Sequence, residues 1–203
     1  MKPADGANTS TRIGRRPSTT PAELSHVALR LFAERGFETT TVDDIAAAAG
    51  IGRTTFFRYF NSKNDLPWGD FEAQLERMRE YLRTRPGDLP LMDALRLSVL
   101  EFNRVPEDEI PYHRERMRLL LTVPALMAHS TLRYEAWRDV VADFVAQRLG
   151  VPRTSSAPST VAWTLMGAAL SAYEQWLQHE DTDLIELLDA SLRLLNSGFA
   201  DLE

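Results

Sequence analysis

The chain contains no cysteine. Disulfide bonds, thiolate nucleophiles and thiolate metal sites are therefore excluded, and a reducing compartment, the cytoplasm, is the expected location. Residues 1–11 are polar and hold no apolar core of a signal peptide, so export is not expected. The most apolar stretch, residues 161–177, is interrupted by polar residues such as Glu174 and is too short to cross a bilayer. We therefore expect no membrane association.

Histidine is also scarce, with four in 203 residues. His26, His113, His129 and His179 are far apart, and no two lie one helical turn apart as paired metal ligands on a helix do. The sequence shows no serine elbow, no phosphate-cradling glycine loop and no paired catalytic carboxylates. We predict a protein that is not an enzyme, with no catalytic residues, no metal site and no cofactor other than a small-molecule effector.

The formal net charge is -6, which is unfavourable for nucleic-acid binding when it is taken over the whole chain. Up to Leu66, however, nine Lys and Arg stand against seven Asp and Glu, and after it 14 stand against 22. Only the N-terminal part carries a positive balance, so it is the part that can attract phosphates.

The chain divides into an arm, a small N-terminal unit and a larger remainder. Residues 1–18 show no hydrophobic periodicity and are expected to form a flexible basic arm. Arg12, Arg15 and Arg16 on this arm could reach into a neighbouring minor groove, and a solvated basic tail is the alternative. The rest shows helical periodicity and no alternating strand pattern. The predicted fold is all-α, with a DNA-binding domain over residues 19–66 and an effector-binding and dimerisation domain over residues 67–203.

Three helices are predicted within residues 19–66. The first begins with a capping box over residues 20–23 and ends near Arg35, before a glycine. The second begins after the cap of Thr41 and ends near residue 50. The third follows a tight glycine turn and covers residues 53–60. These are the elements of a helix-turn-helix.

A fourth helix is expected to follow the cap of Ser62. Pro67 has no amide hydrogen, so a kink or restart is predicted near residues 68–70.

The third helix has the two faces that a helix in the major groove needs. Phe56 and Phe60 are four residues apart and can anchor it to the core, which leaves the cationic side outward. Arg53 and Thr54 are the candidates for base edges, while Arg58, Lys63, Thr41 and Tyr59 would contact the phosphate backbone. The candidate DNA contacts are Arg53, Thr54, Phe57, Arg58, Tyr59, Lys63, Thr41, Arg15 and Arg16.

An apolar cavity beside the interrupted fourth helix, residues 68–83, is expected to hold an effector, because a ligand there could change the spacing of two paired reading heads. The candidate lining residues are Met78, Phe102, Met117, Leu120, Met127, Trp137, Val141, Phe144 and Trp163. In the alternative interpretation these side chains are plain core. Arginines that could pair with phosphate or carboxylate groups of the ligand are Arg77, Arg96, Arg116, Arg118 and Arg133.

Two apolar seams with helical spacing near the C-terminus predict an antiparallel helical hairpin. Two such hairpins would form the four-helix interface of a homodimer. The seam residues are Trp163, Met166, Leu170, Tyr173, Leu177, Ile185, Leu188, Leu192, Leu195 and Phe199.

About a quarter of the chain resembles the signature of TetR-family regulators. The matching residues are Thr41-Val42-Asp43-Asp44-Ile45-Ala46-Ala47-Ala48-Ala49-Gly50-Ile51, Phe56-Phe57-Arg58-Tyr59-Phe60, Lys63 and Leu66. Gly52 replaces the usual serine or threonine cap, which weakens that cap slightly. Phe57 replaces a common tyrosine whose hydroxyl often touches phosphate, so Phe57 either contacts a thymine methyl or packs. The resemblance implies a TetR-like fold of about nine helices that binds double-stranded DNA as a homodimer.

Further stretches, residues 66–71, 94–96, 123–126 and 129–134, are similar to the mycofactocin-system regulators of actinobacteria. This resemblance implies control of genes for a peptide-derived redox cofactor, with a long-chain acyl-CoA as effector. The predicted function is a ligand-responsive repressor that binds a palindromic operator as a homodimer. The alternative is a helical acyl-binding or enzymatic protein whose N-terminal module serves only in association.

Overall fold

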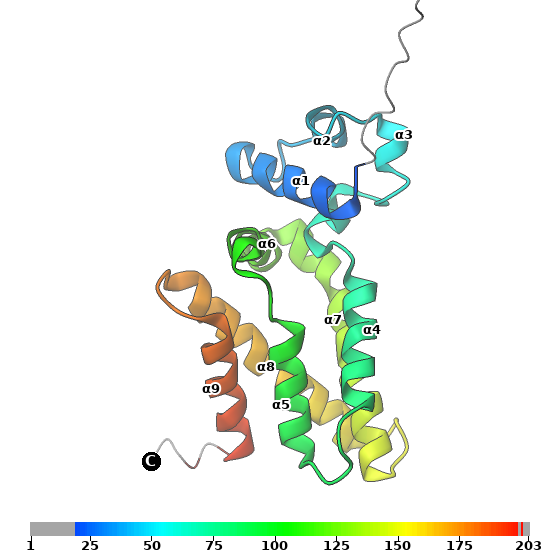
Figure 1. Ribbon diagram of the computed structural model, residues 1–203, viewed down its shortest axis with the longest axis vertical. Helices are drawn as coiled ribbons and strands as arrows, with labels where there is room; N and C mark the ends of the chain where they lie inside the picture. The colour runs from blue at the N-terminus through cyan, green and yellow to red at the C-terminus, as the bar shows by residue number, and fades with distance from the viewer. Residues whose placement is uncertain (1–18, 199, 201–203) are drawn as a thin grey trace, which may run out of the picture.

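The computed structural model describes residues 19–198 and 200 of the chain. Within these residues the chain forms nine α-helices and two 3-10 helices and no strand, which confirms the predicted all-α fold. Figure 1 shows a small head of three helices above an elongated body of six. The head comprises α1 (Pro21–Arg35), α2 (Val42–Ala48) and α3 (Arg53–Phe56). The 3-10 helix η1 (Lys63–Trp68) leads into the body, which comprises α4 (Phe71–Arg83), α5 (Leu91–Phe102), the 3-10 helix η2 (Glu107–Glu109), α6 (Ile110–Thr122), α7 (Pro124–Leu149), α8 (Ser156–Gln178) and α9 (Leu184–Asn196).

The predicted helix ends of the head are confirmed by their caps. The Glu23 amide donates to the Thr20 hydroxyl at 3.2 Å, and the Thr20 amide donates to the Glu23 carboxylate at 2.8 Å. Gly36 has a φ of 87° and its N–H donates to the carbonyl of Phe32, whose ring centroid lies 4.9 Å from that of Phe37. A glycine with positive φ followed by an apolar residue that packs back onto the helix is a common helix end, and here it terminates α1.

The third helix is shorter than the predicted residues 53–60. It is α-helical only to Phe56. After that residue, Arg58 N–H donates to the carbonyl of Thr55 and Tyr59 N–H to that of Phe56, in each case three residues earlier, as in a 3-10 helix. Phe60 still reaches the core and is 6% exposed. The last turn is therefore compressed, while its two anchoring phenylalanines keep the predicted inward direction.

The predicted interruption after Ser62 is also confirmed. Ser62 caps η1, which contains Pro67, and Gly69 then takes a φ of 54° before α4 begins at Phe71. A proline cannot donate the bond that a continuous α-helix requires, so the chain restarts instead of continuing. The head and the long α4 are joined through this short 3-10 segment (Figure 1).

The C-terminal helices α8 and α9 form the predicted hairpin and pack against each other along their lengths. Asp183 caps α9 by accepting from the Glu186 amide at 2.9 Å. Helix α7 also packs against α8 and contacts α4, α5 and α6, so it joins the hairpin to the rest of the body. No helix in the described part of the chain is long and apolar enough to cross a membrane.

Candidate nucleic-acid interface and effector cavities

The head presents one polar face at α3 and the turn that follows it. Phe56 is fully buried under α3, whereas the predicted base-reading residues Arg53 and Thr54 are exposed. Arg58 is exposed as well, and Phe57 is 43% exposed. An apolar anchor below and cationic side chains above match the arrangement that a major-groove helix needs.

Two arginines of this face rest on aromatic neighbours. The guanidinium of Arg53 lies 5.3 Å from the ring centroid of Phe57 and donates to the Asp43 carboxylate at 2.9 Å. Both side chains of that ion pair are more than half exposed, so solvent screens it and Arg53 can exchange Asp43 for another acceptor. Arg58 lies 5.4 Å from the ring centroid of Tyr59. We infer that the two rings limit the motion of cations that remain open to solvent.

Lys63 and Thr41 are engaged within the head. The Lys63 ammonium donates to the carbonyls of Phe37 at 2.8 Å, Glu38 at 3.3 Å and Thr40 at 3.2 Å. These three acceptors use all three of its protons. The Thr41 hydroxyl accepts from the Asp44 amide at 3.1 Å as the cap of α2. Lys63 therefore holds the α1–α2 turn to η1, and its contact with phosphate stays a prediction.

This placement predicts an effect of Lys63→Ala on stability. Three backbone carbonyls would lose a charged donor, so the free energy of unfolding should fall by about 1 to 3 kcal/mol. Urea denaturation followed by circular dichroism measures this loss. Arg58→Ala is the control, because its exposed side chain should contribute less than about 0.5 kcal/mol. Equal stability of the two variants would show that the three contacts contribute nothing.

Four of the predicted site residues and arm residues lie outside the described residues. They are Arg12, Arg15 and Arg16 of the N-terminal arm and Phe199 of the C-terminal seam.

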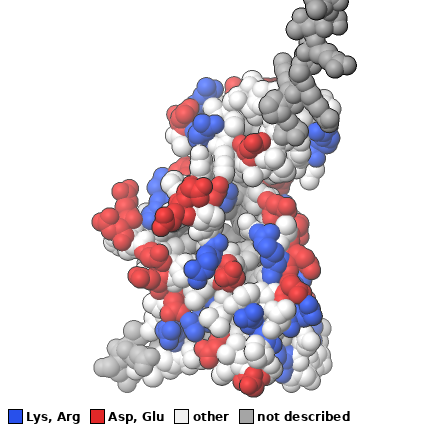
Figure 2. Space-filling model, in the orientation of Figure 1, with Lys and Arg blue, Asp and Glu red and all other residues white. Residues whose placement is uncertain are grey.

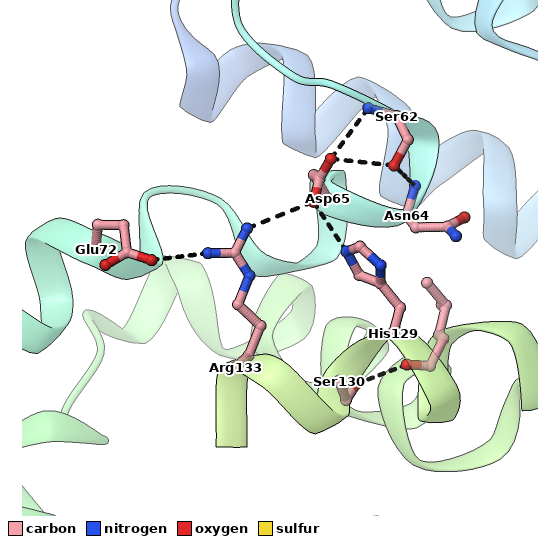
Figure 3. A network of polar contacts seen from close by, with 8 residues as sticks. Ser62, Asn64, Asp65, Glu72, His129, Ser130 and Arg133 are labelled. Carbon is pink, nitrogen blue, oxygen red and sulfur yellow. Dashed lines mark hydrogen bonds and ion pairs between the residues drawn. The ribbon is translucent and has the colours of Figure 1, made fainter. Parts of the chain in front are cut away.

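The joint between head and body is a polar network centred on Asp65 of η1 (Figure 3). Its carboxylate accepts from the Ser62 amide at 3.0 Å, from His129 Nε2 at 2.9 Å and from Arg133 at 3.4 Å. Arg133 also donates to the exposed carboxylate of Glu72 at 2.9 Å. The carboxylate thus links the cap of η1 to α7. The sequence shows the local Ser62 cap, but no local signal pairs Asp65 with a residue 64 positions away.

Burial raises the pKa of Asp65, but hydrogen bonds from His129 and Ser62 and the charges of His129 and Arg133 outweigh it. The net result is a pKa below the ordinary 3.8. Asp65 is therefore ionised at neutral pH and holds two side chains of α7.

An inner cavity of about 100 Å³ lies in the body. Four of the predicted pocket residues line it, namely Phe102, Met117, Leu120 and Trp137, and Met78 lines a second, outer cavity. Four others lie outside both: Met127 and Trp163 are more than half exposed, Val141 is buried elsewhere, and Phe144 is half-buried. Met127, Val141 and Phe144 lie on α7, which has 26 residues, so its faces and far end extend past the cavity, whereas Trp163 lies on the exposed side of α8.

A buried polar chain forms part of the inner wall. The Tyr173 hydroxyl donates to Asn103 Oδ1 at 2.5 Å, because the Asn103 amide group already donates to the Val99 carbonyl. Tyr173 must then accept from His113 Nε2 at 2.9 Å, which leaves His113 Nδ1 unprotonated. Burial, and then the charge of Arg116, lower the pKa of His113 to about 4, so His113 is neutral at pH 7. The inner cavity therefore combines apolar walls with a fixed, uncharged hydrogen-bond chain.

The predicted dimer residues in the described part of the chain fall into three groups by exposure. Met166, Tyr173, Leu188 and Leu192 are nearly or fully buried within the single chain, so they cannot form a surface for a second copy. These four assignments are corrected: the seam faces the chain's own helices, and Tyr173 lines the inner cavity. Trp163 is exposed, with the guanidinium of Arg138 3.7 Å from its ring centroid. The half-buried members of the seam are Leu170, Leu177, Ile185 and Leu195.

Charge on the body is mixed. Figure 2 shows Lys and Arg intermingled with Asp and Glu over the face in view, so that face of the body presents no surface of one sign. Within residues 19–198, no group of three His, Asp or Glu is placed to hold a metal ion. The cationic face at α3 and the two cavities are candidate sites for DNA and for a ligand.

A helix-turn-helix head on a helical body with an apolar cavity defines a DNA-binding transcriptional regulator. Residues 24–66 match the family described as bacterial regulatory proteins, tetR family, and residues 89–200 match the family described as MftR C-terminal domain. The chain belongs to the TetR family of transcriptional regulators, with a body of the MftR C-terminal type.

Two relatives and a solved structure support this assignment. A Mycobacterium tuberculosis (strain ATCC 25618 / H37Rv) protein, named as the mycofactocin biosynthesis transcriptional regulator MftR, is 49% identical over 188 residues, 93% of this chain and 95% of that protein. The regulator TcmR of Streptomyces glaucescens is 30% identical over 182 residues, 86% of this chain and 80% of TcmR. The repressor FadR of Thermus thermophilus, in complex with lauroyl-CoA, has a TM-score of 0.58 and 26% identity over 88% of this chain and 94% of FadR. All three are named as transcriptional regulators or repressors.

Proposed function

We propose that the chain is a ligand-responsive repressor that binds a palindromic operator as a homodimer and acts in the cytoplasm on mycofactocin-related genes. The observation that carries this proposal is the cationic face of α3, which is open to solvent while Phe56 and Phe60 hold it to the core. The similarity to the M. tuberculosis regulator supports the choice of genes.

In this proposal each part of the head has a separate task. Arg53 and Thr54 contact base edges, and Phe57 contacts a thymine methyl beside them. Arg58 and Tyr59 bind phosphate oxygens, which sets the register of the head on the duplex without reading its sequence.

The dimer surface is proposed to be the outward face of α8 and α9. Its exposed and half-buried residues are Thr160, Trp163, Gly167, Ser171, Leu187, Ala190 and Leu194. Gly167 supports this choice, because a glycine inside a helix costs about 0.5 to 1 kcal/mol relative to alanine. A Cβ added there meets nothing within 4 Å in this chain, so the chain's own packing does not require the glycine. Close approach of a partner helix would explain it.

The proposed effector is a long-chain acyl-CoA. Support comes from the lauroyl-CoA in the FadR structure and from the apolar lining of the inner cavity. Met117 and Met166 are part of that lining, and methionine adapts its shape to flexible chains. A ligand larger than the present 100 Å³ would require such adaptation.

A mobility-shift experiment tests the proposal. The full chain is titrated against a duplex from upstream of its own gene and against a scrambled duplex of the same length and composition. We expect the upstream duplex to be retained at a protein concentration at least about 1,000-fold lower. Equal retention of both duplexes, or turnover of an acyl thioester without any retention, would contradict the proposed repressor.

A further inference from the structure

The outer cavity lies between the head and the body and has a volume of about 710 Å³. Pro21, Ala22, Ser25 and His26 of α1 form its wall on the head side. Residues of α4, the end of α5, the segment 104–106 and α6 form the opposite wall. The two cavities share five lining residues, so they adjoin: Trp68, Gln74, Phe102, Val105 and Arg116.

The acidic groups in this wall already have partners. Asp70 accepts from the Ala73 amide at 3.2 Å as the cap of α4, and Glu80 pairs with Arg83 at 2.5 Å. Glu101 pairs with Arg104 at 3.5 Å, and Glu109 pairs with His26 at 3.0 Å.

Two arginines in the same wall lack such partners within the described part of the chain. Among the described residues, Arg77 makes no ion pair, and the buried Nε of Arg116 has no hydrogen-bond partner. The indole N–H of Trp68, which lines both cavities, is also buried without a partner. A buried donor without an acceptor is costly, so the Arg116 Nε and the Trp68 indole N–H indicate a missing acceptor, and the exposed Arg77 adds an unpaired positive charge to the same wall.

We propose that the outer cavity binds the anionic part of an amphipathic ligand, a carboxylate or phosphate group held by Arg77 and Arg116, while its apolar part enters the inner cavity. This inference deepens the proposed effector site and rests on the proposed function for its link to DNA. Guanidinium groups are suited to both anions, because their planar donors match carboxylate and phosphate oxygens.

Such a ligand would contact the head directly. His26 of α1 stacks on Tyr112 with ring centroids 4.1 Å apart, and its Nε2 lies 3.0 Å from the Glu109 carboxylate. Glu109 and Arg116 line the same cavity; burial lowers the pKa of Arg116, and the charge of Glu109 opposes this effect. An anion held at Arg116 would lie in the same wall as the Glu109 carboxylate of η2, and repulsion between the two negative charges would weaken the contact of Glu109 with His26 of α1. Ligand binding is thereby coupled to the position of the head.

Calorimetric titration of the full chain with palmitoyl-CoA, palmitate and CoA tests the site. Arg77→Gln should weaken binding of palmitoyl-CoA about tenfold, and Arg116→Gln at least as much. Arg79→Gln is the control, because Arg79 lies on the same helix, pairs with Glu76 at 3.1 Å and is not in the cavity wall. Palmitoyl-CoA is a thioester without a carboxylate, so weakened binding of palmitate alone would identify the anion as a carboxylate. If only the two CoA compounds are weakened, the anion is a phosphate.

The same variants separate this inference from the proposed function. Without ligand, the Arg77→Gln variant should retain the upstream duplex as the unchanged chain does. The palmitoyl-CoA concentration that gives half of the full effect on duplex retention should be about tenfold higher for this variant. Arg77 is exposed, so this variant remains informative even if Arg116→Gln does not fold. The inference is overturned if none of the three probes binds, or if Arg77→Gln binds each within twofold of the unchanged chain. If the unchanged chain binds palmitoyl-CoA in calorimetry and Arg77→Gln binds it about tenfold more weakly, but neither retains the upstream duplex, only the proposed function is removed.

Discussion

The free energy of unfolding of an Asp65→Ala variant is expected to be about 3 kcal/mol lower than that of the unchanged chain. The Asp65 side chain is only 13% exposed and accepts bonds from Ser62, His129 and Arg133. Removing it leaves the η1 cap incomplete and two side chains of α7 without their shared acceptor. Chemical denaturation of the full chain measures the loss.

Glu72→Ala provides a matched control for this change. Glu72 pairs with the same Arg133 at 2.9 Å, but its side chain is 70% exposed. A screened surface pair of this kind contributes at most about 1 kcal/mol. If the two variants lose equal stability, burial of the Asp65 network would not be the source of its contribution.

The network also predicts sensitivity to acid. The pKa of Asp65 in the folded chain is below its ordinary 3.8, so its contribution is complete above pH 3.8 and is lost as the pH falls through the folded value. The stability difference between the unchanged chain and Asp65→Ala should therefore shrink as the pH falls below 3.8.

Gly167→Arg is expected to convert the dimer to monomers and to weaken operator binding more than about 100-fold. An arginine among small residues would be buried by the partner helix without a counter-charge, and such burial is strongly unfavourable. A monomer also holds only one of two half-sites. Native mass spectrometry gives the oligomeric state, and the mobility shift gives the loss of retention.

The monomer itself should fold normally, because a Cβ at position 167 meets nothing within 4 Å in the chain. Circular dichroism checks this point. Gln147→Arg on the exposed side of α7 adds the same charge away from the proposed surface and should leave the dimer intact. A dimeric Gly167→Arg variant that binds operator normally would show that α8 is not in the interface.

The helix ends could be predicted from the sequence because their signals are local. Thr20, Thr41, Ser62 and Asp183 each cap the helix that follows, and each lies within three residues of the amide it accepts from. The inward direction of Phe56 and Phe60 followed from spacing alone. The hairpin of α8 and α9 followed from two apolar seams in succession.

The remaining features depend on contacts between distant segments. Periodicity shows that a face is apolar, but not whether the same chain or a second copy covers it, and so Met166 and Leu188 were assigned to the wrong surface. Lys63 carries the positive charge expected of a residue that binds phosphate, yet the fold places three backbone carbonyls around its ammonium group. His129 meets Asp65 only after α7 packs against η1.

The most direct test of DNA reading by α3 is the affinity of Arg53→Ala for the upstream duplex and for a scrambled duplex, each measured at several salt concentrations. Arg53 is exposed beside Phe57 and is placed to meet a base edge. The expected result is a loss of about 1 to 3 kcal/mol on the upstream duplex, with binding to the scrambled duplex almost unchanged. An equal loss on both duplexes would contradict base reading by Arg53.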